Sequence, residues 1–160
     1  MKIDGPCVIF LQMVEIIEVA RKLVEKEGVL FLLAKDKRFL TELRVKEGSG
    51  FYGRFRVPGG EIEKGESPVQ AAFREVFEEH GVVVKKMVYL DTFEDVTLNN
   101  QLVRLHAFLI VDYAGEPKEL EPEKSLLYWF EEDKATECLK LASSRLVLNL
   151  ARQYLSGQDR

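Results

Sequence analysis

Residues 60–82 read GEIEKGESPVQAAFREVFEEHGV, and this stretch carries the start and stop signals of a helix. Ser67 is a favourable N-cap, Pro68 suits the first helical position, and Gln70 can complete a capping box with Ser67. Gly81 is a natural helix stop, because glycine adopts the left-handed conformation without strain. The stretch therefore predicts one helix between these signals.

One face of this predicted helix is apolar, and much of the rest is acidic. The spacing i, i+3, i+4, i+7 predicts a buried face. Its members are Val69, Ala72, Phe73, Val76 and, as a packed residue, His80. Glu75, Glu78 and Glu79 lie on an arc that we expect to point away from this face. Such neighbouring carboxylates repel each other by about 0.2–0.5 kcal/mol per pair. The arc is either a solvated acidic face that Arg74 partly compensates, or a site for a hard cation such as Mg²⁺ or Mn²⁺.

The stretch also follows a longer pattern, G-x5-E-x7-R-E-U-x-E-E-x-G-U with U aliphatic, from Gly60 to Val82. Chance would produce such a match in a chain of this size on the order of once in ten million. The pattern resembles the Nudix box, and the chain resembles a Nudix hydrolase of the MutT type. The resemblance implies an α/β (α+β) fold, an α/β/α sandwich with a mixed β-sheet, in a single domain over residues 1–160. It also implies hydrolysis of a diphosphate bond in a nucleoside diphosphate linked to another group.

The resemblance implies roles for the acidic residues of the box. Glu78 and Glu79 match its main metal-binding carboxylates, and Glu75 matches a further metal ligand or a base that Arg74 orients. A divalent cation, Mg²⁺ or Mn²⁺, would neutralise phosphate oxygens and lower the pKa of bound water.

Further candidates flank the box. Glu66 would anchor the loop before the helix or bind a second metal, and the Gly59 carbonyl is a candidate backbone ligand. In many family members a carboxylate beyond the box is a metal ligand or the general base. Glu119, Glu121 and Glu123 are the candidates here, and a merely solvated loop is the alternative.

Substrate contacts are expected near the glycine-rich loop that precedes the box. Phe51, Tyr52, Arg54 and Phe55 are candidates, although core packing is the favoured alternative for Phe55. Many members carry Trp just before the Pro-Gly-Gly turn, where this chain has Phe55. His106 is a further candidate, with an interior or sheet-face position as its favoured alternative.

Alternation and turn residues predict the other elements. The expected strands are Glu15–Val24, Val29–Ala34, Phe55–Val57, Val82–Leu90, Leu102–Val111 and Leu126–Phe130. Glu25–Gly28 is expected to turn the first strand into the second as a hairpin, Lys46–Gly53 to form a loop, and Asn99-Asn100 a turn. A last helix is expected from Ser143 or Ser144 to about Leu155.

Composition excludes several classes of protein. The 160 residues include 23 Lys and Arg and 27 Asp and Glu, a net charge of −4, which argues against a duplex nucleic-acid binder. Cys7 and Cys138 are expected to be ordinary thiols. No signal peptide or membrane span is expected, so we expect a cytoplasmic protein without membrane partners. Homodimers are common among members of the family that the chain resembles.

The downstream sequence favours one substrate group. Residues 115–124, followed by Trp129, resemble the corresponding stretch of MutT-type enzymes, which act on nucleoside triphosphates, including oxidised ones. The proline, tyrosine and upstream signatures of the ADP-ribose, dinucleoside-polyphosphate and coenzyme A groups are missing. ADP-ribose, nucleotide sugars and dinucleoside polyphosphates remain alternatives, as does a non-catalytic nucleotide-binding regulator, which the intact Glu75, Glu78 and Glu79 disfavour.

Overall fold

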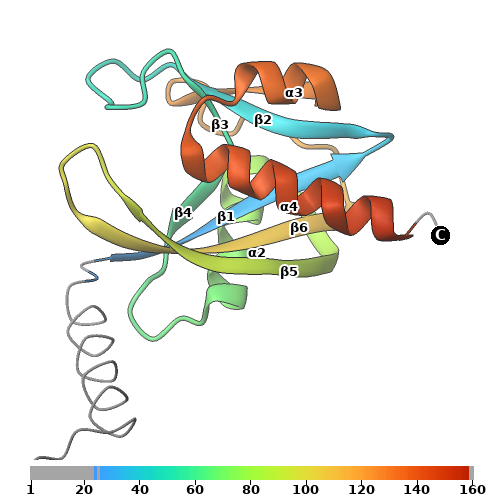
Figure 1. The fold of residues 1–160 in the computed structure, drawn as a ribbon, viewed down its shortest axis with the longest axis horizontal. Coiled ribbons are helices and arrows are strands. Elements are labelled where there is room, and N and C mark those ends of the chain that lie inside the picture. Colours follow the sequence, from blue (N-terminus) through green and yellow to red (C-terminus); the bar gives the residue numbers. More distant parts are fainter. Residues whose placement is uncertain (1–23, 25, 159–160) are drawn as a thin grey trace, which may run out of the picture.

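A computed structural model describes residue 24 and residues 26–158, which form a seven-stranded mixed sheet with flanking helices (Figure 1). The strands are β1 (Lys26–Lys35), β2 (Arg38–Arg44), β3 (Phe55–Arg56), β4 (Gly59–Glu61), β5 (Val83–Val96), β6 (Leu102–Ala114) and β7 (Ser125–Glu131). The helices are α2 (Pro68–His80), α3 (Glu132–Cys138) and α4 (Ala142–Gln158). The strand order is β3-β2-β1-β6-β5, with β4 on β1 and β7 on β2. β1 and β6 run parallel, whereas β5 and β6 are antiparallel.

Alternation along β1 separates two layers of core. Phe31 and Leu33 pack with Val76 of α2, whereas Leu32 packs with Leu148 of α4. Figure 1 accordingly shows α4 crossing the sheet on the side opposite to α2. This arrangement confirms the expected mixed sheet between helices.

β1 forms a hairpin with the strand that follows it in the chain, whereas the sequence predicted a hairpin with the strand before it. β1 pairs with β2 through a two-residue turn at Asp36 and Lys37, whose φ angles of 52° and 60° are those of a type I′ turn. β2 was not predicted. The predicted strand Glu15–Val24 lies outside the described residues except for Val24, which is not in a strand.

The predicted turn Glu25–Gly28 is wrong. Residues 26–28 belong to β1, where Gly28 pairs with Glu61 of β4 and with Leu105 of β6. A Cβ atom on Gly28 would lie 3.0 Å from the Gly60 carbonyl oxygen. Gly28 therefore allows a close approach between strands and does not form a turn.

Most of the remaining elements are where the pattern predicted them. β3, β5, β6 and β7 overlap the expected strands, residues 46–53 are a loop, and Asn100 has a positive φ of 62° in the expected turn. The last helix is confirmed as α4, whereas β4 and α3 were not predicted. Cys138 is a free thiol at the end of α3, and Cys7 lies outside the described residues.

The ends of α2 are as predicted, and its buried face is confirmed at Ala72, Val76 and His80 but not at Val69 and Phe73. The Ser67 hydroxyl accepts from the Gln70 N–H at 3.2 Å, and the Gln70 side chain accepts from the Ser67 N–H at 2.9 Å. Val69 and Phe73 are 47% and 43% exposed. The buried residues of α2 are Ala71, Ala72, Val76 and His80. The buried arc is therefore rotated toward Ala71. Glu75 and Glu79 lie between Ala71 and Ala72 on the helical wheel, so the expectation that they point away from the buried face is wrong.

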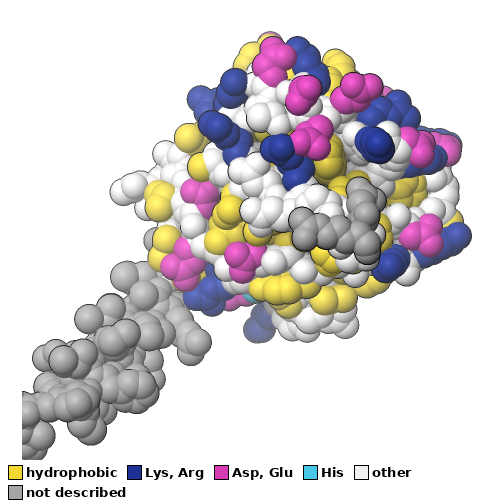
Figure 2. Space-filling model, turned by 45° about the vertical axis from the view of Figure 1, so that its right-hand side comes forward, with side chains coloured by type: hydrophobic (Ala, Val, Ile, Leu, Met, Phe, Trp, Pro, Cys, Tyr) yellow, Lys and Arg dark blue, Asp and Glu magenta, His cyan; other side chains and the backbone are white. Residues whose placement is uncertain are grey.

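The distribution of charged side chains on the surface indicates whether the protein can bind nucleic acid. On the face shown in Figure 2, basic and acidic side chains are interspersed over the upper part, and hydrophobic side chains gather lower down. This face therefore carries no continuous basic surface of the kind that binds a phosphate backbone. No helix within the described ranges is long and apolar enough to cross a membrane.

Candidate active site

Arg74, in the middle of α2, is the centre of an ion-pair network. Its Nε and Nη2 atoms donate to both Glu66 carboxylate oxygens at 2.9 Å, and Nη1 donates to Glu75 at 2.8 Å and to Glu78 at 3.1 Å. Hydrogen bonds from Arg74 lower the pKa of Glu66, and these carboxylates raise the pKa of Arg74. A single guanidinium group, that of Arg74, therefore fixes the positions of both Glu75 and Glu78.

Glu66 anchors the loop before α2. Its Oε2 atom accepts from the Glu63 N–H at 3.0 Å, and Arg74 also donates to the Glu61 carbonyl oxygen at 3.0 Å. The sequence had left Glu66 as a loop anchor or a second-metal ligand, and its contacts in this structure are those of an anchor.

The Gly59-Gly60 turn lies directly against α2. A Cβ atom on Gly60 would lie 2.0 Å from the Glu75 carboxyl carbon, and one on Gly59 would lie 2.1 Å from the Val29 carbonyl oxygen. Position 59 therefore requires glycine, because a side chain there would meet backbone, whereas a side chain at position 60 would have to displace the Glu75 carboxylate.

Glu79 is a largely buried carboxylate. Its Oε2 atom is buried without a hydrogen-bond partner among the described residues. Burial, followed by the nearby charge of Glu42, raises the pKa of Glu79 to about 8. Burial also raises the pKa of Glu75. Carboxylates in this state are poised to bind a cation, because a cation supplies the missing partner for the charged form.

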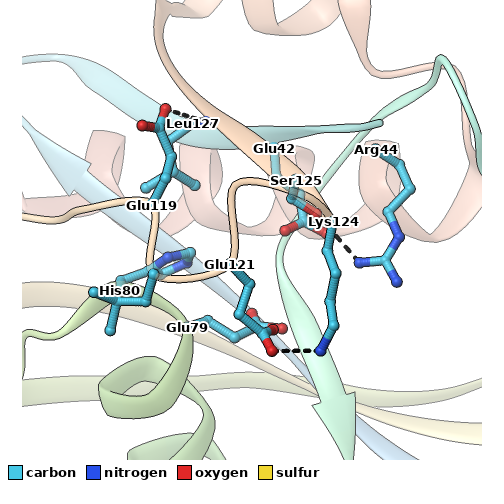
Figure 3. Close-up of a pocket in the computed structure, with 10 residues that line it drawn as sticks. Glu42, Arg44, Glu79, His80, Glu119, Glu121, Lys124, Ser125 and Leu127 are labelled. Carbon is cyan, nitrogen blue, oxygen red and sulfur yellow. Dashed lines mark hydrogen bonds and ion pairs between the residues drawn. The ribbon is translucent and has the colours of Figure 1, made fainter. Parts of the chain in front are cut away.

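A pocket joins Glu79 to distant parts of the chain (Figure 3). It is lined by Glu42 and Arg44 of β2, Glu79 and His80 of α2, Glu119, Leu120, Glu121 and Lys124 of the β6–β7 loop, and Ser125 and Leu127 of β7. Glu121 is directed toward Glu79 and forms an ion pair with Lys124, and Arg44 donates to the Ser125 hydroxyl at 3.2 Å. Acidic and basic groups thus share one pocket.

The three loop carboxylates differ in position. Glu121 faces Glu79, whereas Glu119 accepts from the Leu127 N–H at 3.1 Å. Glu123 is exposed and does not line the pocket. The structure therefore brings Glu121, and not Glu123, together with the acidic residues of α2.

Four residues at the site were not foreseen as site residues: Arg44 and Lys124, which line the pocket, and the ion pair of Glu42 and Arg56. Glu42 is only 2% exposed and pairs with Arg56, which also donates to the Gly59 carbonyl oxygen at 3.2 Å. A glutamate two residues after the core residue Leu40 occupies an inward-facing position of β2. The two-residue spacing from Leu40 could have indicated that Glu42 is buried, but β2 itself was not predicted.

A comparison with models of known protein families identifies the family to which the chain belongs. The model of the NUDIX domain matches residues 24–149. The chain belongs to the Nudix family. It is therefore a Nudix pyrophosphohydrolase, and members of this family typically use a divalent metal.

Relatives of this Nudix protein carry the names of enzymes that act on nucleoside triphosphates. The 8-oxo-dGTP diphosphatase of Haemophilus influenzae is 27% identical over 119 residues, covering 74% of this chain and 78% of that protein. The oxidized purine nucleoside triphosphate hydrolase of Danio rerio is 31% identical over 106 residues, covering 66% of this chain and 65% of that protein. The crystal structure of a MutT NUDIX hydrolase from Burkholderia pseudomallei has a TM-score of 0.71 and 24% identity, over 78% of this chain and 96% of that one. The last similarity shows the shared fold.

The oxygen donors of the Nudix box fit a hard divalent cation. Carboxylate and backbone carbonyl oxygens are the ligands that Mg²⁺ prefers, and the unpartnered oxygen of Glu79 needs such a partner. Within the part of the chain that the structure describes, no three acidic, histidine or cysteine side chains converge closely enough to hold a metal. Glu75 and Glu78 each contact Arg74 through one carboxylate oxygen, Oε1 of Glu75 and Oε2 of Glu78.

The expected substrate contacts of this Nudix chain lie outside the pocket. Phe55 packs edge-on against Tyr128 and Phe130, with ring centroids 5.3 and 5.2 Å apart. Phe51 lies beside Arg56, and Tyr52 and Arg54 are exposed. These four residues remain predictions as substrate contacts.

The two histidines have separate surroundings. His106 Nδ1 lies 2.8 Å from the Thr92 hydroxyl and its Nε2 lies 3.3 Å from Glu27, on the sheet face. His80 is buried against Phe31 with a centroid distance of 5.6 Å, and burial lowers its pKa. His80 is therefore packed in the core, as the sequence predicts.

Proposed function

We propose that this protein hydrolyses nucleoside or deoxynucleoside triphosphates in the cytoplasm, including oxidised purine nucleotides, to a nucleoside monophosphate and pyrophosphate. The observation that carries this proposal is the pocket in which Glu79 and Glu121 face each other beside Arg44 and Lys124. The names of the Haemophilus and Danio relatives support the choice of substrate.

We assign the cation, Mg²⁺ or Mn²⁺, to the acidic side of this site. Glu75, Glu78, Glu79 and the Gly59 carbonyl would hold it, and Glu66 would keep Arg74 in place. When bound, a divalent cation neutralises phosphate oxygens and makes water a better nucleophile at neutral pH.

The remaining residues of the pocket orient the substrate and move a proton. Arg44 and Lys124 are cationic and would bind the phosphate oxygens. Glu121 would accept the proton of the attacking water, after the phosphates have drawn Lys124 away from its ion pair.

A panel of nucleotides tests the proposal. Incubation with Mg²⁺ and chromatographic separation is expected to give monophosphate and pyrophosphate from triphosphates, with oxidised purines preferred, and EDTA is expected to abolish the reaction. ADP-ribose or dinucleoside polyphosphates as the preferred substrates would contradict the assignment. Nucleotide binding without any hydrolysis would instead indicate a regulator.

The position of bond cleavage is a second test. The resemblance to MutT-type enzymes implies that water attacks the β-phosphorus. Reaction in ¹⁸O-labelled water is therefore expected to place the label in pyrophosphate. Label in the monophosphate would indicate attack at the α-phosphorus, and release of orthophosphate would contradict the proposed orientation.

A further inference from the structure

Arg56 connects three segments around the Gly59 carbonyl. It lies in β3, two residues before Pro58, and its Nη2 donates to the Gly59 carbonyl oxygen at 3.2 Å. Its Nε pairs with Glu42 of β2, and its guanidinium carbon lies 5.5 Å from the centre of the Phe51 ring in the glycine-rich loop. One side chain therefore contacts β2, the loop and the turn.

The pair with Glu42 determines where Arg56 can lie. The Glu42 side chain is only 3% exposed, and a buried carboxylate without a countercharge would destabilise the fold strongly. The Arg56 guanidinium is planar and fixes several donors in one plane, so pairing with Glu42 also fixes the donor that reaches Gly59.

The carbonyl can accept from Arg56 and still bind a cation. A carbonyl oxygen has two lone pairs, and the Arg56 N–H occupies one of them. The neighbouring Pro58 carbonyl accepts from the Phe31 N–H at 3.0 Å, which holds the turn on β1 from its other side.

We infer that Arg56 is a positioning residue of the metal site: held by Glu42, it orients the Gly59 carbonyl toward the cation. This inference rests on the proposed function, because it takes the Gly59 carbonyl as a metal ligand. Arg56 contacts a ligand and no reacting atom, so it sets metal affinity and not the rate at saturating metal. Removing a group that hydrogen-bonds to a metal ligand typically weakens metal binding about 10- to 100-fold.

Titration of metal-free protein with Mn²⁺, with free Mn²⁺ measured by electron paramagnetic resonance and no nucleotide present, tests the inference. Arg56→Lys keeps the positive charge beside Glu42 but replaces the planar group by a single nitrogen. We expect its Mn²⁺ Kd to rise about 10- to 100-fold. With substrate, the Mg²⁺ concentration for half-maximal rate should rise by a similar factor, while kcat at saturating Mg²⁺ stays within about threefold.

Arg152→Lys is the matched control, because Arg152 pairs with Glu132 at 2.5 Å between α4 and α3, away from the site. Its Mn²⁺ Kd should equal that of the wild type. If Arg56→Lys does not fold, the double variant Glu42→Gln/Arg56→Gln, which removes both charges, replaces it with the same expectation.

The outcomes separate the inference from the function on which it rests. A lower Tm with unchanged Mn²⁺ affinity would give Arg56 a structural role only and overturn the inference. Tighter Mn²⁺ binding would mean that Arg56 competes with the cation, which also overturns it. A wild type that binds no Mn²⁺ would contradict the proposed function as well.

Discussion

At the scale of single residues, Glu79 opposes the folding of the metal-free chain. Its Oε2 atom is buried without a partner among the described residues, and a buried acceptor in this state destabilises by about 1–3 kcal/mol. A bound cation would satisfy this oxygen. The fold therefore maintains at Glu79 an arrangement that serves ligand binding better than stability.

Glu79→Gln is expected to make the stability of the metal-free protein less dependent on pH. The folded carboxyl keeps its proton up to a pKa of about 8, whereas the unfolded one releases it near 4.5, so the folded chain binds more protons between these values. Wild-type stability therefore falls as pH rises through this window. Glutamine does not titrate, so the advantage in Tm of the variant should grow from about pH 4.5 to about pH 8, as thermal denaturation in EDTA would measure. A pH-independent difference would contradict the assignment.

The loop carboxylates offer a matched pair of variants for the general base. Glu121 faces Glu79, whereas Glu123 is exposed outside the pocket. Glu121→Gln is expected to lower kcat by about 10²- to 10⁴-fold, and Glu123→Gln to leave it near the wild-type value. Steady-state kinetics at saturating Mg²⁺ measure both. The reverse result would assign the base to Glu123, and two active variants would make Glu75 the leading choice.

At the scale of elements, the site depends on how closely the Gly59-Gly60 turn approaches α2. The helix ends are fixed by Ser67 and Gly81, and β4 holds the turn on β1. The Glu75 carboxylate then occupies the space that any side chain at position 60 would need.

Gly60→Ala is expected to displace the Glu75 side chain while the fold survives. The new methyl group would lie 2.0 Å from the Glu75 carboxyl carbon, which is the flexible end of that side chain. Misplacing a catalytic group by about 1 Å can lower the rate about 10²-fold, so we expect a loss of that order in kcat/KM.

Gly157→Ala is the control for this variant, because no atom lies within 4 Å of its new methyl group. Circular dichroism would verify that both variants fold. Normal activity of Gly60→Ala would show that Glu75 does not need its observed position.

At the scale of the whole molecule, the pocket forms only when distant segments meet. β2, the C-terminal end of α2, the β6–β7 loop and β7 each supply part of its lining. The opposite layer is also tied to this region, since the buried Ser144 hydroxyl of α4 accepts from the Val57 N–H at 3.0 Å. A ligand that bridges the pocket therefore stabilises the folded chain as a unit.

Mg²⁺ is expected to raise the Tm of the wild type, because it binds the folded state alone. At a concentration 100 times its Kd the stabilisation is about 2.7 kcal/mol. Differential scanning calorimetry with and without Mg²⁺ would measure it, with Glu79→Gln as the control that loses most of the shift. An equal shift in both proteins would place the cation elsewhere.

Local signals in the sequence determined much of this protein. The capping box at Ser67, the stop at Gly81 and the spacing of the box predicted α2 and the family, because each depends on residues only a few positions apart. The same holds for α4 and for the strands with clear alternation. The turn predicted at Glu25–Gly28 was wrong because a glycine among charged residues usually indicates a turn. Here the absence of a side chain on Gly28 allows neighbouring strands to approach closely.

Only the tertiary structure decided which side chains share the pocket. Packing on the sheet buried Ala71 together with the predicted Ala72 and Val76, left Val69 and Phe73 partly exposed, and turned Glu79 inward. The pairing of β2 brought Glu42 and Arg56 to the site, and the path of the β6–β7 loop selected Glu121. These choices depend on contacts between residues far apart in the chain, which local spacing does not encode.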